Sequence, residues 1–137
     1  MTIRTQLGLA AITIALAVIG ACGPPADHTA TLTRLRDAIG APIASPTQLE
    51  DHNQLVENVV QSGALEGLRQ FEVQERLGRG TECGARPICH ERGFRPTDWI
   101  YDVGRDPNDP QLAAGPTLIV GFDSTGIVDN TYFVTRR

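Results

Sequence analysis

Hydrophobic residues recur three or four positions apart in the middle of the chain, the spacing of an amphipathic helix. The clearest example follows Ser45, which precedes a proline and stands three residues before Gln48, an arrangement typical of a helix N-terminus. This helix is expected to end at Gly63, because glycine readily adopts the left-handed conformation that closes helices. A second helix is predicted over 69–77, and its residues expected to be buried are Phe71, Val73 and Leu77.

The hydrophobic period changes from 3.6 to two after Pro96. Three runs rich in β-branched and aromatic residues predict strands over 97–103, 116–123 and 127–134. The last two are joined by Asp123-Ser124-Thr125-Gly126, a sequence suited to a hairpin turn. The expected fold is therefore α+β with two layers, a helical hairpin packed on a three-stranded antiparallel sheet in the order ααβββ.

The N-terminus has the pattern of an export signal. Arg4 precedes an uncharged, mostly apolar run over 7–21, which as a helix would be about 22 Å long and too short for a bilayer core of roughly 30 Å. A signal peptide over 1–21 is therefore expected. The run ends in Ile19-Gly20-Ala21-Cys22, which resembles the lipobox of bacterial lipoproteins. The resemblance implies acylation of Cys22 and, because glycine rather than aspartate follows it, anchoring in the outer membrane. The alternative is a secreted protein in which Cys22 has no such role.

The expected organisation is a signal peptide (1–21), a lipid anchor and tether that includes a short helix (22–44), and one α+β domain (45–137). The chain has 12 basic and 16 acidic residues and a net charge of −4. Since the signal peptide holds one arginine and no acid, the rest of the chain is more acidic still. This balance argues against nucleic acid or an anionic membrane surface as a partner bound through charge.

Three segments together resemble the SmpA/OmlA (BamE-like) family, small outer-membrane lipoproteins of the β-barrel assembly machine. They are Gly67-Leu68 with Val73 and Leu77-Gly78, the aromatic strand Trp99-Ile100-Tyr101, and the hairpin over 118–128. The resemblance implies a non-enzymatic adaptor whose domain lies in the periplasm and whose partners are β-barrel assembly proteins. The chain departs from the family at Arg69, where a helix-capping Ser or Thr is common, and in the longer stretch over 80–96.

That longer stretch carries the two remaining cysteines, Cys83 and Cys89. In an oxidising compartment they are expected to form a disulfide. One alternative is a zinc site that adds His90, but it would need a fourth ligand and reduced thiols. Haem attachment would need the spacing C-x-x-C-H, and five residues separate these cysteines. No cofactor or metal is therefore predicted.

A cluster of basic residues near an aromatic one is the candidate interaction patch. It consists of Arg86, Arg92, Arg95 and Trp99, and it would suit a lipid headgroup or an acidic partner. The alternative is that these arginines serve solubility and pair locally with Glu82, Glu91 and Asp98.

The sequence contains no catalytic signature, nucleophile–base pair or nucleotide-binding loop, so neither an enzyme nor a small-molecule substrate is predicted. Asp106 and Asp109 lack the alternating acids and closing glutamate of a calcium loop and are expected in a polar turn. His28 and His52 are expected to be solvated or partly packed. A second functional hypothesis is a periplasmic inhibitor or ligand-binding module of β-lactamase-inhibitor-like fold, because fold alone does not determine function.

Overall fold

The computed structural model describes residues 27–137, and the predicted signal peptide and Cys22 lie outside this range. The described chain is α+β, as predicted, and its elements are α1 (Thr29–Gly40), α2 (Pro46–Gln61), α3 (Gln70–Leu77), β1 (Thr81–Glu82), α4 (Pro87–Glu91), β2 (Trp99–Asp102), β3 (Thr117–Phe122) and β4 (Val128–Val134). None of these helices has the length and apolar character needed to span a membrane.

The sheet has four strands, not the three that were predicted. Its order is β1-β2-β3-β4, and every neighbouring pair is antiparallel. The extra strand β1 is only two residues long and pairs Thr81 with Ile100 and Glu82 with Trp99. A strand this short leaves no alternating hydrophobic pattern, which is why the sequence did not predict it.

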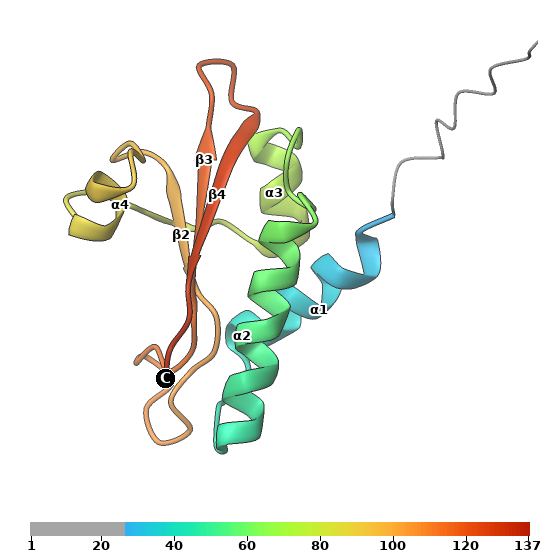
Figure 1. The fold of residues 1–137 in the computed structure, drawn as a ribbon, viewed down its shortest axis with the longest axis vertical. Coiled ribbons are helices and arrows are strands. Elements are labelled where there is room, and N and C mark those ends of the chain that lie inside the picture. The colour runs from blue at the N-terminus through green and yellow to red at the C-terminus, as the bar shows by residue number, and fades with distance from the viewer. Residues whose placement is uncertain (1–26) are drawn as a thin grey trace, which may run out of the picture.

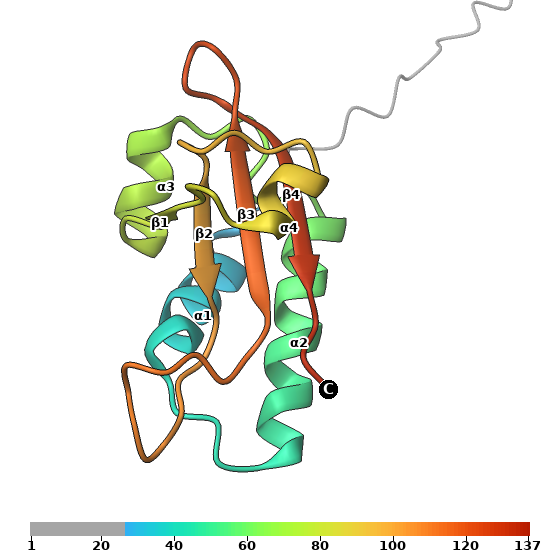
Figure 2. The same cartoon turned by 90° about the vertical axis from the view of Figure 1, so that its left-hand side faces the viewer.

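The helices are divided unequally between the two faces of the sheet. Figures 1 and 2 show α1, α2 and α3 on one face and the short α4, with the loop that carries it, on the other. The predicted order ααβββ is therefore incomplete: α1 precedes the helical hairpin of α2 and α3, and β1 and α4 lie between that hairpin and β2.

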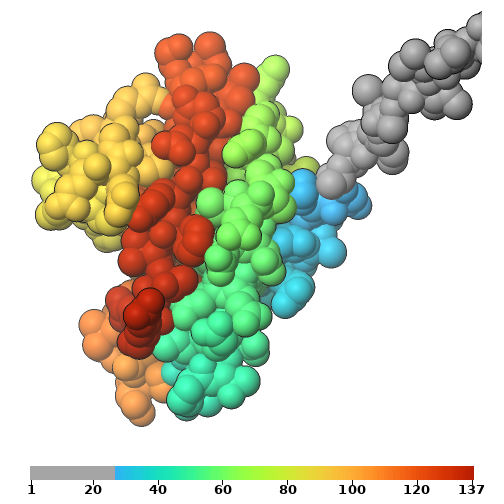
Figure 3. All heavy atoms as spheres, in the orientation of Figure 1, coloured from blue at the N-terminus to red at the C-terminus, as the bar shows by residue number. Residues whose placement is uncertain are grey.

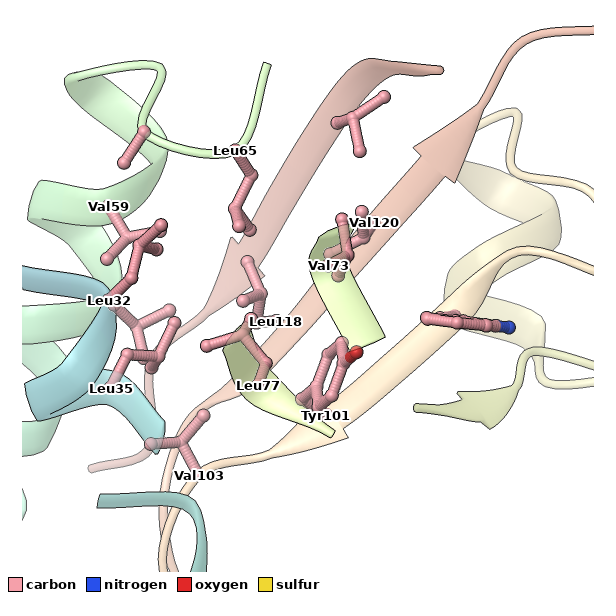
Figure 4. Packing of buried hydrophobic residues seen from close by; sticks show 14 of the residues in the cluster. Leu32, Leu35, Val59, Leu65, Val73, Leu77, Tyr101, Val103, Leu118 and Val120 are labelled. Atoms are coloured by element: carbon pink, nitrogen blue, oxygen red, sulfur yellow. The ribbon is translucent and has the colours of Figure 1, made fainter. Parts of the chain in front are cut away.

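The main core lies between the sheet and its three helices. Side chains from α1, α2 and α3 converge on those of β2 and β3 (Figure 4). The most completely buried residues of this core are Leu32, Leu35, Val56, Val59, Leu65, Val73, Val103, Leu118 and Val120. Leu32 and Leu35 belong to α1, which the sequence assigned to the tether over 22–44. Their burial makes α1 part of the domain, which begins at Thr29 in the structure rather than at residue 45.

The two helices of the hairpin begin differently. The Ser45 hydroxyl accepts a hydrogen bond from the Gln48 N–H at 3.2 Å, and the Gln48 side chain accepts one from the Ala44 N–H at 2.7 Å. At α3, the Arg69 side chain makes no capping bond, but the Glu72 carboxylate accepts a hydrogen bond from the Arg69 N–H at 2.7 Å. One half of the capping arrangement therefore persists despite the arginine.

The prediction that Phe71 is buried was wrong. Its side chain is 57% exposed, whereas Val73 and Leu77 on the same helix are buried. Two residues correspond to about 200° of rotation around a helix, so Phe71 and Val73 point in nearly opposite directions.

An irregularity in β4 places neighbouring side chains of that strand on unexpected faces. Gly121 pairs with Asn130 but Phe122 pairs with Val128, so Asp129 is an extra residue and forms a bulge. Such a bulge reverses the alternation of faces. Val128 therefore joins the main core, while Tyr132 packs against the opposite face, although their even spacing predicts one common face.

Tyr101 connects the sheet to the end of α3. Its hydroxyl donates a hydrogen bond of 2.7 Å to the Gly78 carbonyl, and burial raises the pKa of this phenol well above its ordinary value of about 10. The folded protein therefore keeps the proton at a pH where the unfolded chain loses it, so the free energy of unfolding should fall as the pH rises above about 10.

Replacing Tyr101 with phenylalanine tests this contribution. Near neutral pH the Tyr101→Phe variant should lose about 1 kcal/mol of stability, the typical net value of one hydrogen bond. Above pH 10 the difference between wild type and variant should shrink. Urea unfolding of both proteins between pH 7 and pH 11 measures it, and a difference that stays constant with pH would contradict the assignment.

Candidate interaction surface

The loop over 83–96 is built as a compact unit on the second face of the sheet. A disulfide joins Cys83 to Cys89, with their Cα atoms 6.1 Å apart. The ends of the loop are held by hydrogen bonds from the Cys83 N–H to the Asp98 carbonyl and from the Gly84 N–H to the Pro96 carbonyl, both 2.8 Å. Pro87 begins α4 inside the loop, in the first helical position where proline is favoured.

A second, smaller core fixes this loop to the sheet. It consists of Cys83, Cys89, Phe94, Ile100 and Ile119, with Ile88 and Tyr132 at its margin. The Phe94 ring lies so close to Gly121 that a Cβ atom at that position would be 3.0 Å from it. Glycine in β3 therefore allows the loop to approach the sheet closely.

Arg86 and Arg92 are exposed on the outer side of this region and Tyr132 is half-buried there, and we call these three residues the arginine face. The Arg92 guanidinium carbon lies 4.6 Å from the centre of the Tyr132 ring, within the range of a cation–π interaction. Arg86 Nη1 is 4.0 Å from the Asp102 carboxylate. Within residues 27–137, Arg92 forms no ion pair. The face therefore presents a positive charge that the domain itself does not neutralise.

Two of the four residues predicted for the patch do not belong to this face. Trp99 is only 2% exposed, packs in the main core and meets Phe122 edge to face at a centroid distance of 5.2 Å. Its neighbour in β2, Ile100, faces the arginine side, because successive residues of a strand point to opposite faces. The aromatic partner of the arginines is therefore Tyr132, which the sequence did not single out.

Arg95, the second residue of the predicted patch that lies outside the arginine face, contacts Asp98 at the end of the loop. Its backbone N–H donates to the Asp98 carboxylate at 2.7 Å, and its side-chain Nε lies 3.9 Å from the same carboxylate. Asp98 is buried and also accepts a hydrogen bond from the Phe122 N–H at 3.1 Å. This carboxylate therefore ties the end of the loop to both β2 and β3, and Arg95 contributes to that tie.

The acidic partners of the arginines only partly match the sequence-based expectation. Asp98 pairs with Arg95 as expected, whereas the partner of Arg86 is Asp102. Glu82 lies 3.7 Å from Arg79, an arginine outside the predicted cluster.

Removing the disulfide should destabilise the domain modestly. The Cys83→Ala/Cys89→Ala variant should lose about 2 kcal/mol, because the short loop gains conformational freedom in the unfolded state and the second core loses two buried sulfur atoms. Urea unfolding of the oxidised wild type, the reduced wild type and the variant measures this. Equal stability of all three proteins would show that the loop does not depend on the bond.

The other candidate residues of the described chain do not come together as a metal site. Among residues 27–137, no three His, Cys, Asp or Glu side chains are grouped so that they could hold a metal ion. Asp106 lies in a polar turn, where its carboxylate accepts hydrogen bonds from the Asn108 and Asp109 N–H groups at 2.7 and 3.2 Å. His52 packs on α2 with Nδ1 2.8 Å from the Gln48 carbonyl. His28 precedes α1 and is partly exposed, and His90 lies on α4 with its side chain exposed.

Comparisons of the chain with protein-family models, with curated proteins and with solved structures found no match.

Proposed function

We propose that this protein is a non-enzymatic lipoprotein of the outer membrane, acylated at Cys22, whose periplasmic domain is an adaptor in the assembly of outer-membrane β-barrel proteins. The anchor and the location rest on the lipobox-like sequence before Cys22, and the assembly role rests on the resemblance to the SmpA/OmlA family. The arginine face is the surface that we assign to the partner.

The arginine face is the observation that carries an adaptor role. Arg92 stands on Tyr132 without an acidic partner in the described chain, on a loop that the disulfide and the second core hold in place. A preorganised arginine on an aromatic ring is a common element of protein interfaces, because little conformational entropy is lost when a partner binds. The domain as a whole is acidic, so this face is distinct in charge from its surroundings.

The proposed anchor would keep the domain close to the bilayer. Cys22 lies only seven residues before Thr29, the first residue of α1. Even a fully extended chain of that length spans no more than about 25 Å. An adaptor held at this distance would meet partners at the membrane surface, and two or three acyl chains would make the attachment stable.

Co-purification tests the proposal. The full-length protein would be extracted from its own host in mild detergent, and a β-barrel assembly component should be recovered with it in near-stoichiometric amount. The Arg86→Glu/Arg92→Glu variant should lose that component. Arg34→Glu/Arg36→Glu on α1 is the matched control, since it makes the same charge change at exposed positions away from the arginine face. Wild-type protein that recovers no such component would contradict the assembly role.

The inhibitor hypothesis gains no support from the geometry. An inhibitor of this kind would need an exposed aromatic side chain on the sheet face opposite the helices, able to enter an enzyme cleft. Tyr132 is the aromatic side chain found there, and it is partly buried beneath Arg92.

A further inference from the structure

Beyond Val128, whose N–H and C=O groups bond to Leu68 and Gly67, the outer edge of β4 is open and lies beside the arginine face. β4 is the last strand of the sheet, and β3 pairs with it on one side only. In Figure 3 this strand, drawn in red, lies at the surface between α2 and the region of α4. The opposite edge of the sheet is the two-residue β1, so β4 is the long edge of the molecule.

The direction of the free backbone groups follows from Phe122. Its N–H donates to the Asp98 carboxylate, on the side of β2. Backbone groups of successive strand residues point to alternate sides, so Ile119 and Gly121 bond toward β4 and their partners there are Tyr132 and Asn130. Thr131 and Phe133 therefore direct their N–H and C=O groups outward. No other segment of residues 27–137 forms hydrogen bonds to them.

This edge lacks most of the features that protect strand edges from pairing. Proteins usually block such edges with prolines, charged residues, bulges or very short strands. The bulge at Asp129 and the hydrogen bonds between Val128 and residues 67–68 protect only the beginning of β4. The five residues from 130 to 134 contain no charge, proline or glycine.

The side chains along the edge favour an acidic incoming strand. Tyr132 carries the Arg92 guanidinium on the α4 side, and Arg86 lies on the same side. Val134, next on that side of the strand, is 39% exposed and offers an apolar contact. A residue of an added strand that lies beside Tyr132 would stand next to a positive charge that the domain leaves unpaired.

We propose that the β4 edge binds an extended segment of a partner protein by strand addition, and that this segment carries an acidic side chain toward Arg92. Main-chain hydrogen bonds to Thr131 and Phe133 hold the segment, and the arginine face selects its charge. This inference rests on the proposed adaptor function. It specifies that the arginine face binds an acidic, extended segment of the partner.

Two synthetic peptides of the same shape and opposite charge test the proposal. Acetyl-TEVEVET-amide and acetyl-TKVKVKT-amide would each be titrated into the non-acylated domain, residues 27–137 with the disulfide formed, and followed by amide NMR. The glutamate peptide should shift the Thr131 and Phe133 amide signals and slow their hydrogen exchange. The lysine peptide should bind about tenfold more weakly, because it replaces an attraction to Arg92 with a repulsion.

Variants separate the main-chain and charge contributions. Thr131→Pro removes an outward N–H that the domain does not use, so the protein should remain folded and its affinity for the glutamate peptide should fall at least about tenfold. Thr131→Ala is the matched control and should bind like wild type. Arg92→Gln should bind both peptides with nearly equal affinity. The amide spectrum of each variant verifies its fold.

Three results would overturn the proposal: binding of neither peptide, equal binding of both peptides by the wild type, or peptide-induced shifts that avoid β4. A free domain that sediments as a dimer with Thr131 and Phe133 already protected would assign the edge to a second copy of the chain instead. The outcome is independent of co-purification, because the peptides test the edge directly. If the peptide binds but no assembly component co-purifies, strand addition at β4 stands and the assembly role is wrong. If an assembly component co-purifies but no peptide binds, only strand addition at β4 is wrong.

Discussion

Replacing Leu35 with alanine is expected to lower the free energy of unfolding by about 3 kcal/mol. Leu35 is fully buried in α1 and packs in the main core with residues of α3 and the sheet. Removing a buried leucine side chain costs its transfer free energy and leaves a cavity, which together amount to roughly 2–5 kcal/mol. The result decides whether α1 is an integral part of the domain or a segment of the tether.

Leu112→Ala is the matched control for this measurement. Leu112 lies in the loop that connects β2 to β3 and is 56% exposed. The same change there should alter stability by less than about 0.5 kcal/mol. Urea unfolding of the two variants and the wild type gives the comparison. A Leu35→Ala variant as stable as Leu112→Ala would show that the domain folds without α1 and begins at α2.

Replacing Asp98 with alanine is expected to cost about 3 kcal/mol as well. The buried carboxylate accepts hydrogen bonds from the N–H groups of Arg95 and Phe122, at 2.7 and 3.1 Å. Its removal leaves these donors without their partner, and each lost bond to a charged group costs about 1.5 kcal/mol or more. The loop end should loosen, so the amides of 94–98 should also exchange faster in hydrogen-exchange measurements.

Two further variants make the Asp98 result specific. Asp98→Asn keeps one acceptor oxygen and should lose less stability than Asp98→Ala. Asp51→Ala removes an exposed carboxylate from α2 and should change stability by less than about 0.5 kcal/mol. If Asp98→Ala were no less stable than Asp51→Ala, the carboxylate would not hold the loop.

Sequence periodicity predicted the helices and strands in which the apolar residues of the local pattern are also the residues buried in the fold. The helix after Ser45 and the strand around Leu118 are of this kind, since each presents a regular apolar stripe to one core. α1 was located as a helix but assigned to the tether, because its stripe is short and Gly40 and Pro42 follow it. Its docking depends on the sheet surface formed by residues far along the chain, which periodicity does not report.

The sequence predicted no helix or strand over 80–96 for a related reason. β1 and α4 are two and five residues long, and their positions depend on the disulfide, on Asp98 and on packing against Ile119. Each of these contacts joins the segment to another part of the chain or closes it on itself. No local hydrophobic pattern accompanies them.

The sequence predicted the basic residues of the candidate surface but not which side chains share its face of the sheet. Arg86 and Arg92 lie on one exposed face, whereas Trp99 lies on the other side of the sheet. The alternation of side chains along β2 could have placed Trp99 correctly, because Trp99 shares its face with Tyr101 and the core rather than with Ile100. Tyr132 could not be placed in the same way, since the bulge at Asp129 reverses the faces of β4 and the sequence does not indicate it.

The intact mass of the protein extracted from membranes shows whether the domain is anchored through Cys22. We expect a chain that begins at Cys22, carries a diacylglycerol group on the thiol and an acyl group on the amine, and remains in the membrane fraction. Cys22→Ser should abolish both the added mass and the membrane association. A chain cleaved elsewhere, or one without lipid on Cys22, would show that Cys22 does not anchor the domain.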